Sequence, residues 1–69
     1  MKLSARNQLP ATVTKVTEGP ATANVELECD GMRLVASITV EAARELGLET
    51  GKQVTAIVKA TDVILAVNE

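Results

Sequence analysis

Apolar and polar residues alternate along most of the chain with a period of two, which is typical of half-buried β-strands. The clearest run covers residues 21–30, where Ala, Val, Leu and Cys are separated by Thr, Asn, Glu and Asp. A second run covers residues 32–39, and the Asp30-Gly31 dipeptide between the two runs suits a tight type I′ hairpin. Residues 9–14 alternate in the same way. The pattern changes phase at Val16, where we expect a bulge or the end of the strand.

One short helix is predicted between the third and fourth strands. Thr39 is a suitable N-cap, Glu41 lies in the first turn, where the helix dipole favours an anion, and Gly47 stands at the C′ position. Two further strands are predicted over about Gln53–Lys59 and Val63–Val67. This order of elements predicts an all-β fold with one short helix, a five-stranded OB-like Greek-key barrel.

The chain has 69 residues, which suits a single small domain over residues 1–69 with a core worth only roughly 3–5 kcal/mol. The last predicted strand, Val63–Val67, is apolar on both faces, and Ile57 adds a large apolar side chain to the outer face of the strand before it. Because a barrel of this size has one inside, we expect another subunit to cover the outer apolar face. The alternative is a last strand buried beneath the helix.

The composition excludes several classes of function. The chain contains no His, Phe, Tyr or Trp and a single Cys, so it lacks a Ser-His or Cys-His nucleophile pair, an imidazole or thiolate metal site and a platform for base stacking. Its net charge of −2 argues against binding to nucleic-acid phosphates. No apolar run reaches the ~18 residues of a membrane span, and the first residues lack a signal-peptide hydrophobic region. We expect a cytoplasmic protein that is not an enzyme, has no catalytic cofactor and binds neither nucleic acid nor membranes.

The acidic residues offer one cation-binding hypothesis and a simpler alternative. Glu26, Glu28 and Asp30 share one face of a predicted strand and could supply oxygen ligands to a hard cation. Alternation on a solvated strand face explains them without any ligand, and it is the interpretation that we favour. Cys29, at the end of the apolar set of the same strand, is interpreted as a small core residue, and Glu41 and Arg44 are spaced to pair across a helical turn.

Two clusters are rich in hydrogen-bond donors. The segment Ser4-Ala5-Arg6-Asn7-Gln8 precedes the first strand, and Lys59-Ala60-Thr61-Asp62 joins the last two strands. A third, weaker candidate is Thr39 at the start of the helix. A fully ionised tetrahedral oxyanion only accepts hydrogen bonds, so its site needs guanidinium, ammonium, hydroxyl, amide and backbone N–H groups. The alternative is that these residues satisfy a strand entry and keep the surface soluble.

The sequence also resembles a known family. Ser4-Ala5-Arg6-Asn7-Gln8-Leu9 is similar to the S-A-R-N-Q-L signature of the molbindins, or Mop proteins, and Lys59-Ala60-Thr61-Asp62-Val63 resembles their second motif. The resemblance extends from residue 3 to about residue 67. It implies an OB-like fold, a homohexamer built as a trimer of dimers, and molybdate or tungstate bound at subunit interfaces. Carried over by position, the oxyanion-binding residues would be Ser4, Ala5, Arg6, Asn7, Thr39, Lys59, Ala60 and Thr61.

The roles of these residues follow from the same resemblance. Ala5 and Ala60 would contribute backbone N–H groups only, Thr39 a hydroxyl or an N–H at the helix start, and no side chain would ligate the metal directly. Some relatives carry Ser where Ala60 stands, and others carry a hydroxyl residue where this chain has Ala42. The implied function is intracellular binding, storage and homeostasis of the oxyanion. The alternative is an oxyanion-sensing module for molybdate transport or regulation, although the chain shows no DNA-binding helix and no P-loop.

Overall fold

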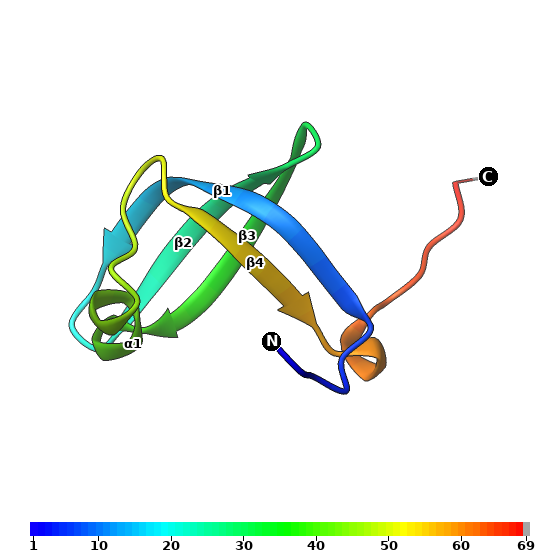
Figure 1. Cartoon of the computed structure of the whole chain (residues 1–69). Coiled ribbons are helices and arrows are strands. Elements are labelled where there is room, and N and C mark those ends of the chain that lie inside the picture. Colours follow the sequence, from blue (N-terminus) through cyan, green and yellow to red (C-terminus); the bar gives the residue numbers. More distant parts are fainter. Residues whose placement is uncertain (69) are drawn as a thin grey trace.

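The computed structural model describes residues 1–68 as an antiparallel sheet of four strands with one short helix (Figure 1). The chain forms, in order, β1 (Asn7–Glu18), β2 (Thr22–Cys29), β3 (Met32–Thr39), α1 (Val40–Glu45), β4 (Gln53–Val58) and a short 3₁₀ turn, η1 (Ala60–Asp62). The strand order in the sheet is β3-β2-β1-β4. Because β4 returns beside β1 after a long connection, this is a Greek-key arrangement, as the sequence predicted.

The prediction of a closed five-stranded barrel is wrong for the single chain. Residues 63–68 form no strand, and the side chains of Ile64, Leu65 and Val67 are 93%, 87% and 81% exposed. In Figure 1 this segment leaves η1 and runs away from the sheet. A strand forms only where a neighbour supplies backbone partners, and η1 directs the chain away from the edges of its own sheet. The sheet is therefore curled but open between β3 and β4.

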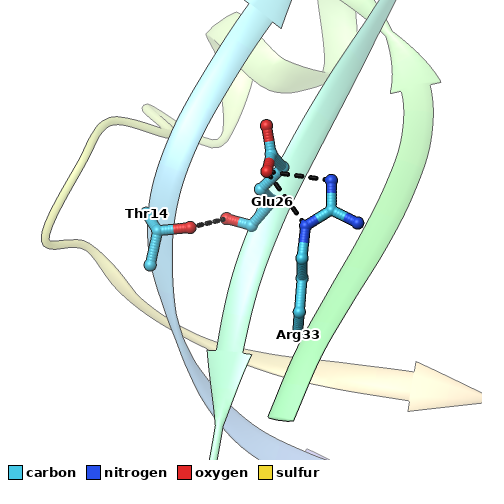
Figure 2. A network of polar contacts seen from close by, with 3 residues as sticks. All are labelled: Thr14, Glu26 and Arg33. Atoms are coloured by element: carbon cyan, nitrogen blue, oxygen red, sulfur yellow. Dashed lines mark hydrogen bonds and ion pairs between the residues drawn. The ribbon is translucent and has the colours of Figure 1, made fainter. Parts of the chain in front are cut away.

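A bulge in β1 allows the strand to pair along two different partners. Its first half pairs with β4, its second half pairs with β2, and the register with β2 shifts between Val13 and Lys15. The sequence predicted an irregularity at Val16, two residues after the extra residue, Thr14. The Thr14 hydroxyl donates to the backbone carbonyl of Glu26 at 3.1 Å, which holds the bulge against β2 (Figure 2).

The core lies on the concave face of the curled sheet. Its buried centre comprises Ala11 and Val13 from β1 and Val25, Leu27 and Cys29 from β2. Half-buried side chains from β3, β4 and the loop before β4 pack around this centre: Leu34, Ala36, Ile38, Leu48, Val54 and Ala56. Cys29 is buried and unpaired, so the prediction that it is a core residue is confirmed.

The turn and helix signals read from the sequence are also confirmed. Asp30 and Gly31 have φ angles of 50° and 79°, as a type I′ turn requires. The Thr39 hydroxyl accepts a hydrogen bond from the Ala42 N–H at 3.0 Å and so caps α1.

Arg44 pairs with Glu18 at 3.2 Å and not with Glu41. The hydrogen bond from Arg44 to the Glu18 carboxylate, and then the opposite charge itself, raise the pKa of the arginine.

Candidate functional site

The pairing of β1 with β4 brings the two donor-rich clusters to one end of the sheet. Asn7 lies opposite Val58 in the antiparallel ladder, so Arg6 and Lys59 stand one step beyond its last pair. The Asn7 side-chain amide donates to the backbone carbonyl of Val58 at 3.1 Å, which ties the two strand ends together. The segments 4–7 and 59–61, more than fifty positions apart in sequence, are therefore neighbours in space.

The donors at this end of the sheet are exposed. Ser4, Arg6, Lys59 and Thr61 all lie on the surface, and neither cation forms an ion pair with any of residues 1–68. Unpaired guanidinium and ammonium groups next to two hydroxyls can bind an anion without first breaking an internal salt bridge.

Backbone groups at the same end hold the donors in place. The Gln8 side-chain amide donates to the Ala5 carbonyl at 3.1 Å, which fixes the turn that precedes β1. In η1 the N–H of Asp62 donates to the Lys59 carbonyl at 2.9 Å, and the N–H of Val63 donates to Ala60 at 3.3 Å. These two bonds leave the N–H groups of Ala60 and Thr61 uncommitted. Gln8 thus acts as the alternative interpretation of the sequence predicted, by satisfying a backbone group at the entry to the first strand.

Thr39 lies apart from the other candidate residues within the chain. It is the last residue of β3, where it pairs with Thr22, and it caps α1. Figure 1 shows α1 and this end of β3 on the opposite side of the sheet from η1. Its hydroxyl already accepts the Ala42 N–H, yet the hydroxyl hydrogen remains available to a second acceptor. Thr39 of this chain therefore cannot join Arg6 and Lys59 of the same chain around one small anion.

The acidic face of β2 is occupied by local contacts. One Glu26 carboxylate oxygen accepts from Nε and Nη2 of Arg33 at 3.1 and 3.0 Å, as Figure 2 shows, and Glu28 accepts the Gly31 N–H at 2.7 Å. Within residues 1–68 no group of three or more Cys, Asp or Glu side chains is placed to hold a metal ion. In the same part of the chain, no helix is long and apolar enough to cross a membrane.

Comparison with known sequences gives one family match over most of the chain. The TOBE domain model matches residues 3–65. The chain is 41% identical over 66 residues to molybdenum-pterin-binding protein 2 of Clostridium pasteurianum, covering 94% of this chain and 97% of that protein. It is 49% identical over 67 residues to the molybdenum-pterin-binding protein MopA of Rhodobacter capsulatus, covering 96% of this chain. The chain spans only 25% of the length of MopA.

Two solved structures have the same fold. A molybdate-binding protein from Sporomusa ovata superposes with a TM-score of 0.93 at 40% identity, covering 97% of this chain and 100% of the other. The cytoplasmic molybdate-binding protein ModG, with molybdate bound, superposes with a TM-score of 0.84 at 46% identity. That match covers 87% of this chain and 43% of ModG.

Proposed function

The chain belongs to the TOBE-domain family of molybdate- and molybdenum-pterin-binding (Mop) proteins, and we propose that it stores a tetrahedral metal oxyanion, molybdate or tungstate, at interfaces between copies of itself. The resemblance read from the two sequence motifs is thereby confirmed. Mop proteins are binders and not catalysts, so the prediction that the chain is not an enzyme is confirmed as well.

One observation carries the proposal: the ladder of β1 and β4 places Arg6 and Lys59 at one end of the sheet, both exposed and without an ion-pair partner among residues 1–68. Molybdate and tungstate carry two negative charges and four acceptor oxygens. Two cations, the hydroxyls of Ser4 and Thr61, the second amide hydrogen of Asn7 and backbone N–H groups meet these needs with donors alone. Asp62 is the single carboxylate in the two donor-rich clusters, residues 4–8 and 59–62. It would act from outside the site by orienting a cation.

The composition favours the free oxyanion over a pterin-bound form of the metal. A pterin is a flat aromatic ring, which proteins commonly hold by stacking and apolar contact. This chain has no Phe, Tyr or Trp. The donor cluster offers charge and hydrogen bonds but no aromatic surface.

The interface part of the proposal rests on exposed apolar surface and on the position of Thr39. Ile57 is 44% exposed, and the apolar residues 63–67, directly after η1, are all exposed as well. Covering this surface with further copies would stabilise a small domain and would close the five-stranded barrel between chains. A hexamer built as a trimer of dimers is one such assembly. Because Thr39 lies at the far end of its own sheet, it would enter the site only from a neighbouring copy.

Binding and assembly would then be thermodynamically linked. Arg6 and Lys59 repel each other while the site is empty, and a bound dianion neutralises both. A ligand that binds the assembled form preferentially also stabilises it. We place this storage in the cytoplasm, supported by the relative ModG, which is described as cytoplasmic.

A sensing role is the second candidate. The chain spans 25% of MopA, so the same domain also occurs within a much longer protein. When such a domain is attached to another domain, binding of the oxyanion would change the contacts between subunits. The protein would then respond to the oxyanion concentration and need not store the ion.

Calorimetric titration with molybdate tests the site. Each charge-assisted hydrogen bond is worth about 1.5–3 kcal/mol, so Arg6→Ala and Lys59→Ala should each weaken binding by roughly 10- to 150-fold. Arg33→Ala is the matched control, since it removes the same charge from β3, away from both donor segments and from Thr39. Wild-type protein that takes up no molybdate, or variants at Arg6 and Lys59 with wild-type affinity, would overturn the assignment.

A further inference from the structure

The side chain of Gln8 links the turn that carries Arg6 to the sheet. Its amide donates to the Ala5 carbonyl at 3.1 Å, and the structure shows no other hydrogen bond between residues 1–6 and the remainder of residues 1–68. Residues 1–6 belong to no helix or strand. Without the Gln8 amide, the segment before β1 would be held by the covalent chain and by packing alone.

This hydrogen bond fixes the peptide group that leads into Arg6. A peptide group is planar and trans, so its carbonyl and its N–H point in opposite directions. Because the Ala5 carbonyl is turned toward the Gln8 side chain, the Arg6 N–H is turned away from it. The Arg6 N–H donates to no carbonyl among residues 1–68. It therefore stays available, in a set direction, to an acceptor from outside the chain.

The neighbouring amide of Asn7 is a different case. It donates to the Val58 carbonyl at 3.1 Å, directly before Lys59. The antiparallel ladder already pairs Asn7 with Val58, so this side chain adds a second restraint to a strand end that the backbone holds. Gln8 instead restrains a turn that the ladder does not reach. Loss of the Gln8 amide should therefore affect the Arg6 half of the site and not the Lys59 half.

The Gln8 amide matters more for the freedom of the turn than for the stability of the fold. Gln8 is exposed, lies opposite Ile57 in the ladder and is not part of the core. At such a position water readily replaces a lost hydrogen bond. Fixing the backbone of one residue, in contrast, changes an equilibrium constant by about 5- to 30-fold. A segment that is ordered in advance does not incur this cost when a ligand binds.

We propose that Gln8 is a positioning residue of the oxyanion site. It holds the turn of residues 4–6, so that the Ser4 hydroxyl and the Arg6 guanidinium are presented to the anion at a fixed spacing. The proposal rests on the oxyanion site proposed above and adds a residue that acts through the turn and not on the ligand. A fixed spacing also favours an anion of one size. A turn released from Gln8 could close around the smaller sulfate ion, so Gln8 contributes to the preference for molybdate.

Gln8→Met tests this role because methionine has a similar length and no hydrogen-bond donor. Gln53→Met is the matched control, since Gln53 is an exposed glutamine at the other end of the ladder of β1 and β4. In calorimetric titrations Q8M should bind molybdate about 5- to 30-fold more weakly than wild type, with a lower ratio of molybdate to sulfate affinity. Q53M should bind like wild type, and both variants should keep melting temperatures close to that of wild type.

Backbone order parameters from NMR report the turn itself. In the ligand-free protein, the order parameters of the Ala5 and Arg6 amides should be near about 0.85 in wild type and below about 0.6 in Q8M. Values below about 0.6 in wild type would overturn the preordered turn, and this result does not depend on the folding of Q8M. Weaker binding by Q8M with unchanged order parameters would make Gln8 a direct ligand and would overturn a positioning role.

The remaining outcomes separate this inference from the proposed function. Wild-type protein that binds no molybdate overturns the oxyanion site and the role of Gln8 with it. If wild type binds molybdate and Q8M binds it equally well, the site stands and Gln8 serves only the entry to β1, whatever happens to the melting temperature. An equal loss of molybdate and sulfate affinity in Q8M overturns the contribution to size preference.

Discussion

Replacement of Thr39 by alanine tests two roles of this residue, as the cap of a helix and as a donor to the oxyanion. Its hydroxyl accepts the Ala42 N–H at 3.0 Å and caps α1, a helix of only six residues. We also propose that the hydroxyl hydrogen reaches an oxyanion held by a neighbouring copy. The first role affects stability in any assembly, whereas the second affects affinity alone.

The expected loss of stability follows from the cap. Removing an N-cap hydroxyl costs about 1 kcal/mol, within a range of about 0.5–2. In a domain of this size, each kcal/mol shifts the melting temperature by about 4–8 °C. Thr39→Ala should therefore lower the melting temperature by about that amount in thermal circular dichroism. Thr39→Ser should stay close to wild type because it keeps the hydroxyl, and Ser37→Ala is the control for loss of an exposed hydroxyl on the same strand.

The binding readout decides the second role. If Thr39 donates to the oxyanion, Thr39→Ala should weaken molybdate binding several-fold. Thr39→Ser keeps the hydroxyl and should bind molybdate with wild-type affinity. An unchanged melting temperature would refute the capping argument. A lowered melting temperature with wild-type affinity would remove Thr39 from the site and leave it as a structural cap.

Three further predictions concern the fold. Val25 is 2% exposed, so Val25→Ala should reduce the free energy of unfolding, measured in urea, by about 2–3 kcal/mol. A loss below about 1 kcal/mol would contradict the packing of Val25 in the core. Gly31 has φ 79° with open space where a Cβ would lie. Gly31→Ala should therefore reduce the free energy of unfolding by about 1–2 kcal/mol from backbone conformation alone. An unchanged urea midpoint would argue against the type I′ turn. Glu26→Gln breaks an exposed ion pair with Arg33 and should cost less than about 1 kcal/mol, with a larger loss indicating a role beyond the surface.

Local signals in the sequence predicted most of the elements. The alternation over 21–30 and 32–39 predicted β2 and β3, and the Asp30-Gly31 dipeptide predicted the turn between them. These signals are reliable because each depends on residues close together in the chain. The bulge was predicted two residues late because the side-chain pattern changes face only after the extra residue has been passed.

The position of the last strand could not be predicted from such signals. The run Val63–Val67 has strong β-forming character, but a strand also requires a neighbour, and the neighbour proposed here belongs to another chain. The site shows the same limit. Sequence identified both donor clusters, but their meeting at one end follows from the register Asn7–Val58, which links residues at opposite ends of the sequence. Thr39 was grouped with them by resemblance, and the fold places it at the other end of its own chain.

An oxyanion site between copies of this chain is tested by native mass spectrometry of the wild-type protein with molybdate, alone and in the presence of excess sulfate or phosphate. We expect a homo-oligomer that retains whole numbers of molybdate or tungstate ions and releases few of them to the competing anions. A monomer, or an oligomer whose mass is the same with and without molybdate, would contradict an oxyanion site built between copies of this chain.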